Sequence, residues 1–377
     1  MFRGYTPALF GRLIALCLVF FASISWCAQA SSVIAFETDE GSWMSLDVSP
    51  MGEYLVFELL GDIYQLPIDG GSARPIINGP EFASQPRLSP DGSRLVFVSD
   101  RSGEDNLWVA KADGTEQKQL SHRADGELIS PAWSRDGQTV YVSQLAGRRS
   151  MNTNVELWAY PTDGSAPEKI STPDMGRGSM LVSTFPPGAY GPAPSAQGDE
   201  IFFTAAAPRQ HGVDAGPSAE IMKVDLSGGH SDTVSAVSSP AFKPMLSSDG
   251  KWLAFGALRG NKTGLRLRDL ETGDERWLAL DIGFNALESW ASRDLLPGFD
   301  FTPTNDSLVM AYGGKIRRIN LASGNVTNIP FSATVSLAVE PRVTTQAAID
   351  QGPVTARLAK GAVISPEGIG HTSSVLA

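Results

Sequence analysis

The chain has 377 residues, of which 42% are hydrophobic, and it contains 38 Gly and 25 Pro. Turn-forming residues are more frequent than average, yet enough apolar residues remain for a core, so disorder is excluded as the dominant state. A formal net charge of −11 and the lack of a Lys/Arg stripe exclude nucleic acid as a partner, because nothing would neutralise its phosphates.

Residues 1–30 have the pattern of a secretory signal peptide. Arg3 and Arg12 come first, the apolar run 13–26 follows, and the small-x-small ending Ala28-Gln29-Ala30 closes the segment. An apolar run of about 14 residues is short for a membrane span and typical of an export signal. An N-terminal membrane anchor is the alternative.

We expect cleavage near Ala30 and therefore a periplasmic or secreted protein. Cys17 and Cys27 are the only cysteines in the chain, and both leave with the signal. The mature chain then has no thiol for a disulfide, a metal site or a nucleophile. No later segment reaches 18 apolar residues, so no membrane span is expected after cleavage.

The rest of the chain is organised by one short phrase, Ser-Pro-Asp-Gly or a variant of it, which recurs six times. The copies begin at Ser49, Ser89, Ser134, Ser195, Ser247 and Thr302. Their spacing of 40 to 61 residues corresponds to one supersecondary unit per copy. The aspartates of the phrase, Asp91, Asp136 and Asp249, are expected to bond to their own turn rather than to act as acids or bases.

Each copy stands within a set of four predicted strands. In the second unit, for example, a short strand over 85–88 precedes the phrase, and alternating apolar strands over 94–98 and 106–109 follow it. A turn at Asp113-Gly114 then leads into a more polar outer strand at 116–120. Period-two patterning with Asp-Gly turns indicates antiparallel strands.

Four-stranded antiparallel units of this length are typical of β-propeller blades. We therefore predict an all-β, six-bladed propeller over residues 31–335, followed by a C-terminal tail over 336–377. Ser365-Pro366-Glu367-Gly368 in that tail is a candidate start of a truncated seventh blade. The segment 33–37 is predicted to join the last blade as a closing strand, which would leave the ring without an exposed edge.

The second unit also resembles a known family. The phrase at 89–92, with Leu95-Val96-Phe97-Val98-Ser99-Asp100-Arg101-Ser102-Gly103 and Asn106-Leu107-Trp108-Val109, resembles the TolB-type propeller repeat of secreted bacterial proteins. The stretches 40–50, 60–64 and 293–298 are similar to the N-terminal propeller of exported amidohydrolase-family proteins. In those proteins a TolB-like propeller precedes a metal-dependent hydrolase barrel.

The amidohydrolase resemblance implies hydrolysis of C–N bonds, but its metal-binding His-x-His pair is missing. The chain has four histidines, which are His122, His211, His230 and His371. Too few residues follow the propeller to form a barrel of about 250 residues. We therefore expect no catalytic residue, no metal ligand and no cofactor in this chain, which would be a stand-alone paralogue or a truncated product.

Loop insertions are the predicted place for specificity. Candidate ligand-binding residues on these rim loops are Arg148, Arg149, Tyr190, Arg209, His211 and Asp214. Arginine, histidine and an aromatic ring near one rim would suit an anionic or peptide ligand. The alternative is that these loops are solvated and bind nothing.

The sequence thus favours a non-catalytic exported propeller that acts as a binding platform. It would bind a protein or peptide partner, or a small ligand at the mouth of the central channel. The alternative is the accessory propeller of a metal-dependent amidohydrolase whose catalytic barrel is missing from this chain.

Overall fold

The computed structural model describes residues 32–123, 127–145, 154–174, 187–207, 218–235, 239–284, 294–339, 358–364 and 371–376. The predicted signal peptide and its cleavage site lie outside these ranges. Residues 33–338 form one compact unit, and a second unit comprises 1–32 and 339–377. Every regular element in the described residues is a β-strand, as the sequence predicts.

The larger unit contains five sheets. The first has the order β1-β26-β5-β4-β3-β2, with β1 (Ser32–Thr38), β2 (Leu46–Val48), β3 (Tyr54–Leu59), β4 (Asp62–Pro67), β5 (Gly71–Ile77) and β26 (Phe331–Val339). The second comprises β6 (Ala83–Leu88), β7 (Arg94–Ser99), β8 (Asn106–Lys111) and β9 (Lys118–Gln119).

The third sheet is eight-stranded and comprises β10 (Leu128–Trp133), β11 (Thr139–Leu145), β12 (Val155–Pro161), β13 (Glu168–Lys169), β14 (Gly188–Pro194), β15 (Glu200–Ala207), β16 (Ser218–Asp225) and β17 (Ser231–Thr233). The fourth comprises β18 (Ala241–Leu246), β19 (Trp252–Arg259), β20 (Lys262–Asp269) and β21 (Glu275–Phe284). The fifth comprises β22 (Asp300–Phe301), β23 (Ser307–Tyr312), β24 (Lys315–Asn320) and β25 (Val326–Ile329).

The smaller unit contributes one described hairpin, formed by β27 (Leu358–Ile364) and β28 (His371–Leu376).

The prediction of six separate four-stranded sheets is wrong, because only three of the sheets have four strands. The eight-stranded sheet consists of β10–β13 and β14–β17, which are linked by a single parallel pairing between Val155 and Gly188. A Cβ on Gly188 would lie 2.1 Å from the Val155 carbonyl oxygen. Glycine at this position therefore lets the two strands approach closely enough to merge.

The repeated phrase forms the turn between the first two strands of each unit. Ser89 Oγ accepts a 2.9 Å hydrogen bond from Arg94 N, and Asp91 Oδ1 accepts one of 3.0 Å from Ser93 N. Gly92 has a φ of 71°, which favours glycine. Asp136 and Asp249 bond their own turns in the same way, so the turn-forming role expected for the aspartates is confirmed.

Hydrophobic clusters join the strands of each sequence repeat to those of the next repeat. Val56 and Ile63 of the first unit, for example, pack with Leu95 and Phe97 of the second. Corresponding clusters follow along the chain, and one further cluster joins the last strands back to the first. Sheets that pack face to face in a closed succession form a β-propeller arrangement.

The tryptophans of the strands pack in or against these clusters. Trp133 belongs to the cluster between the second and third units, and Trp158 packs against it. Trp108 and Trp252 pack against two other clusters.

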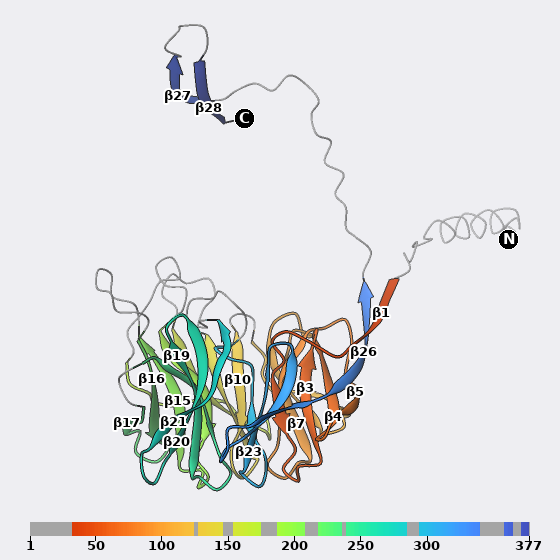
Figure 1. The fold of residues 1–377 in the computed structure, drawn as a ribbon, viewed down its shortest axis with the longest axis vertical. Helices are drawn as coiled ribbons and strands as arrows, with labels where there is room; N and C mark the ends of the chain where they lie inside the picture. The colour runs from red at the N-terminus through yellow and green to blue at the C-terminus, as the bar shows by residue number, and fades with distance from the viewer. Residues whose placement is uncertain are drawn as a thin grey trace, which may run out of the picture. The chain divides into compact units, whose positions relative to one another are not determined.

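The strand β26 closes the succession. It follows β25 of the last sheet and pairs in parallel with β5 of the first, with Phe331 opposite Gly71. The prediction that 33–37 joins the last blade is wrong, because β1 lies beside β26 at the edge of the first sheet (Figure 1). The ring is therefore closed by a strand from the C-terminal end of the propeller.

Candidate functional site

Four inner strands share one irregularity beside the axis of the propeller. Each contains an X-Pro pair at a shift in strand register, and the residue before the proline has a positive φ. These pairs are Gln85-Pro86, Ser130-Pro131, Gly191-Pro192 and Lys243-Pro244. Because proline has no N–H to donate, the ladder is interrupted there, and a bulge redirects the side chains on either side.

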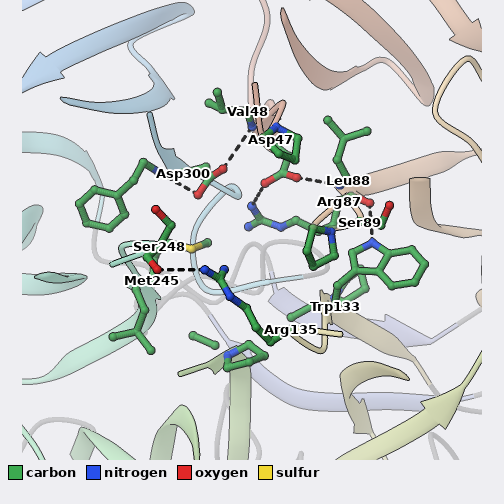
Figure 2. A pocket seen from close by; sticks show the side chains of 18 of the residues that line it. Asp47, Val48, Arg87, Leu88, Ser89, Trp133, Arg135, Met245, Ser248 and Asp300 are labelled. Atoms are coloured by element: carbon green, nitrogen blue, oxygen red, sulfur yellow. Dashed lines mark hydrogen bonds and ion pairs between the residues drawn. The ribbon is translucent and has the colours of Figure 1, made fainter. Parts of the chain in front are cut away.

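A cavity of about 560 Å³ lies between these inner strands. The charged wall of the cavity carries Asp47, Arg87 and Asp300 (Figure 2), and its apolar wall includes Ala132 and Met245. Ala193, Pro131, Pro192 and Pro244 complete the apolar wall. At its outer end the cavity is lined by the turn phrases, including the exposed residues Pro90, Arg135 and Ser248.

The charged wall is held by bonds between different sheets. Arg87 Nη1 on β6 donates to Asp47 Oδ1 on β2 at 2.8 Å, and it also lies 3.3 Å from the Phe299 carbonyl oxygen. Leu88 N donates to Asp47 Oδ2 at 2.7 Å. Asp300 accepts bonds from two backbone amides, Val48 N at 3.3 Å and Phe301 N at 2.8 Å. The wall is therefore preorganised by the propeller itself.

The two carboxyl groups of this wall share an unusual electrostatic environment. Removal from bulk water raises the pKa of Asp47, and the Arg87 guanidinium opposes that effect. Removal from water, together with the neighbouring Asp47 carboxylate, raises the pKa of Asp300 well above its ordinary value. Two carboxylates beside one guanidinium are not both stabilised in the ionised form, so protonation of Asp300 is easier than that of an isolated carboxyl group.

Beneath this layer the cavity ends in a buried polar network. Lys243 Nζ and Ser130 Oγ both donate to Asp294 Oδ2, and Lys243 Nζ also donates to Ser130 Oγ at 2.9 Å. Ser130 N donates to Gln85 Oε1. Burial lowers the pKa of Lys243, and the Asp294 carboxylate opposes that shift. This network forms the floor of the cavity.

Comparisons with known proteins identify the fold. No family model matches the chain. It aligns over 78% of its length with the structure of a putative TolB from Agrobacterium tumefaciens, of which it covers 100%, at 16% identity and a TM-score of 0.54. TolB from Acinetobacter baumannii gives the same identity and TM-score over 77% of this chain and 65% of that chain.

The chain has the fold of a TolB-like β-propeller.

Comparison by sequence also finds relatives that match parts of this TolB-like propeller. A TolB homolog of Chlorobium luteolum is 34% identical over 126 residues, which are 33% of this chain and 26% of the relative. Tricorn protease homolog 1 of Streptomyces coelicolor is 31% identical over 117 residues, or 30% of this chain and 11% of the relative. The chain therefore spans less than half the length of these curated relatives.

Of the six residues predicted to bind a ligand, only Tyr190 lies within the described residues. Arg148, Arg149, Arg209, His211 and Asp214 lie outside the described residues. Tyr190 lies on β14 and is only 3% exposed, and it packs in the cluster between the last sheets.

Sequence reasoning missed the charged wall and the floor of the cavity. A signal was present: the residue two places before the phrase is Asp47, Arg87, Ala132, Ala193, Met245 or Asp300 in the six units. All six of these residues line the cavity. Alignment of the internal repeats therefore would have identified the channel-lining position.

Within the described ranges, no cluster of three or more His, Cys, Asp or Glu side chains is placed to bind a metal ion. Over the same ranges the TolB-like propeller offers no helix that could span a membrane. His122 is exposed beyond β9.

Proposed function

We propose that this chain is an exported, non-catalytic binding platform that holds a ligand in the central cavity of its β-propeller. The observation that carries the proposal is the cavity of about 560 Å³ with one charged and one apolar wall. Sites for small molecules are typically concave, largely apolar and fitted with a few fixed polar groups.

Rigidity supports binding at this site. The Asp47 carboxylate is fixed by Arg87 and by the Leu88 amide, and Lys243 is fixed by Asp294. Ordering flexible groups on binding costs free energy, and groups that are already held avoid that cost. Because Asp47 and Lys243 already have structural partners, the same bonds support a role for these two side chains in positioning a ligand rather than in catalysis.

Export is part of the proposal because of the signal-like residues 1–30. The binding partner would then be a periplasmic or extracellular protein, peptide or small ligand that reaches the mouth of the channel.

Blocking the cavity tests this function. Ala132 is half-buried in the cavity wall, so Ala132→Phe would fill the space without removing a hydrogen bond. We expect a ligand-observed NMR screen of small fragments on the purified full chain to give binders that Ala132→Phe loses. Ala35→Phe is the matched control, because Ala35 is exposed on β1. Fragments that bind both variants equally would place the binding site elsewhere.

A second candidate function is that of an accessory propeller for a hydrolase. It is supported by the matched relatives, of which two are described as a protease homolog and a peptidase and of which the chain covers 11% and 23%. The amidohydrolase resemblance belongs to this alternative. Translation of the DNA downstream of the codon for Ala377 would decide it: a barrel with a His-x-His pair supports the accessory role, and its absence from all frames contradicts it.

A further inference from the structure

We infer that the cavity takes an organic carboxylate whose apolar body lies against the Ala132 and Met245 wall and whose anionic end meets Arg135 and Arg87. This inference rests on the proposed function, since it names the chemistry of the ligand that the cavity would hold.

Arg135 supplies the first reason. It is exposed and belongs to the turn phrase between β10 and β11, and its Nη2 donates to the Ser248 carbonyl oxygen at 3.0 Å. Ser248 belongs to the turn between β18 and β19, so the Arg135 side chain crosses the turn of the intervening unit. Gly198 belongs to that intervening turn, and a Cβ on Gly198 would lie 3.3 Å from Arg135 Cβ. Within the described residues no carboxylate lies at ion-pair distance from this guanidinium.

Arg87 supplies the second reason. Its hydrogen bonds to Leu46, Asp47 and Phe299 all use Nη1, and within the described ranges Nε and Nη2 have no acceptor. A Cβ on Gly298 would lie 2.8 Å from Arg87 Nη2, so glycine makes room for the guanidinium. Figure 2 shows Arg87, on β6, and Arg135, in the turn after β10, at the cavity. Two guanidinium groups with unused N–H donors match the planar oxygens of a carboxylate.

The charge balance of the lining points to an anion. Asp47 compensates Arg87, and Asp294 compensates Lys243. Arg135 also lines the cavity, and within the described residues no carboxylate pairs with its positive charge.

The lining also discriminates between anions. Phosphate sites usually rely on several backbone N–H groups that converge on the oxygens. Four of the inner strands carry a proline at the bulge, and proline has no N–H to offer. A monoanionic carboxylate on an apolar body suits one uncompensated guanidinium, an apolar wall and a cavity of this volume.

The experiment compares three ligands that share one apolar body and differ in charge. The probes are 3-phenylpropionate, 3-phenylpropionamide and 3-phenylpropylammonium, and their affinities for the purified full chain are measured by NMR titration at low and moderate salt. We expect the acid to bind roughly tenfold more tightly than the amide, because a charge-assisted hydrogen bond is stronger than a neutral one. The preference should shrink as salt is added.

Two arginine variants locate the anionic end. Arg135→Gln should remove most of the preference for the acid. Arg259→Gln is the matched control, because Arg259 is exposed at the far end of β19 from the turn phrase, and it should leave the preference unchanged. Equal loss in both variants would show a general effect of net charge and would overturn the inference.

A second arm distinguishes the source of the carboxylate. The peptide Ala-Ala-Phe is titrated with a free and with an amidated C-terminus, beside the small acid. If only the peptide binds more tightly as the free acid than as the amide, the ligand is a protein C-terminus. If the small acid binds more tightly than its amide, the ligand is a small metabolite-like acid. Both results support the inference. Equal binding of acid and amide in both arms overturns it. If fragments still bind and Ala132→Phe removes them, the proposed function survives that result; if nothing binds in the cavity, both fail.

Discussion

Gly71 N on β5 donates a 2.9 Å hydrogen bond to the carbonyl oxygen of Pro330, the residue that precedes β26. This bond begins the parallel pairing through which the last strand of the propeller is joined to the first sheet. Phe331 and Val335 of β26 are buried in the same cluster as Leu46 and Phe57. Closure therefore depends on residues from both ends of the propeller.

Substitution of Gly70 tests this closure. Gly70 has a φ of 96°, and a Cβ there would lie 2.2 Å from the Pro330 carbonyl oxygen. Gly103 has a φ of 97° and nothing within 4 Å of its Cβ position. Gly→Ala at either site costs about 1–2 kcal/mol for the left-handed backbone, and Gly70→Ala should cost more because of the added clash. Urea unfolding of both variants measures the difference. Equal costs would mean that the contact between β5 and Pro330 adds nothing to stability.

The ion pair between Lys243 and Asp294 in the floor of the cavity is expected to contribute strongly to stability. Asp294→Asn leaves Lys243 buried without its carboxylate, and we expect a loss of about 3–5 kcal/mol in the free energy of unfolding. The double variant Lys243→Met with Asp294→Asn removes both charges and should recover much of that loss. Denaturant unfolding of the single and double variants measures the coupling. Additive losses would contradict a direct pair.

The raised pKa of Asp300 predicts how stability changes with pH. A carboxyl group whose pKa is higher in the folded chain than its ordinary value of 3.8 binds protons more tightly when folded. Its stabilising contribution is fully present below pH 3.8 and is lost as the pH rises through the raised value. Asp300→Asn should therefore flatten the decline of the free energy of unfolding with rising pH.

The control for this pH series is Asp91→Asn. Turn hydrogen bonds from Ser89 and Ser93 lower the pKa of Asp91 to about 2, so its contribution is lost as the pH falls, which is the opposite sign. Chemical unfolding at several pH values compares both variants with the parent chain. If Asp300→Asn left the slope unchanged, the raised pKa would be contradicted.

Loss of the serine in the repeated phrase is expected to destabilise the turn that it holds. Ser89 is fully buried, and its Oγ accepts the Arg94 amide and donates to Asp91. Ser89→Ala would leave that buried amide without a partner, which costs about 1–3 kcal/mol. Ser323 makes a similar local bond to Asn320 in an exposed turn, where water can replace it, so Ser323→Ala should cost less. Thermal unfolding of the two variants checks the order.

Much of the fold could be predicted because its signals are local. Alternating strands and the phrase at 89–92 depend on contacts between residues near one another in sequence, such as the Ser89 and Arg94 bond. The partner of β1 could not be predicted, because an edge strand with exposed Val33, Ile34 and Phe36 has no pattern that selects one sheet edge over another. The structure places it beside β26.

The candidate site was harder to predict than the fold. Loop composition directed attention to Tyr190, which is buried, while the cavity wall is formed by Asp47, Arg87 and Asp300 from three different sheets. None of these residues stands near another in the sequence, and a lone Asp or Arg in a strand carries no sign of its partner.

The sequence by itself determined the all-β class, the repeated unit and the turn chemistry of the phrase, since hydrogen bonds within a few residues decide these features. Only the tertiary structure decided that two units merge at Val155 and Gly188, that β26 closes the ring, and that Arg87 lies 2.8 Å from Asp47. These relationships depend on the angle at which successive sheets pack, which brings the inner strands of distant units around one axis. A cavity with charged and apolar walls therefore exists only in the closed propeller.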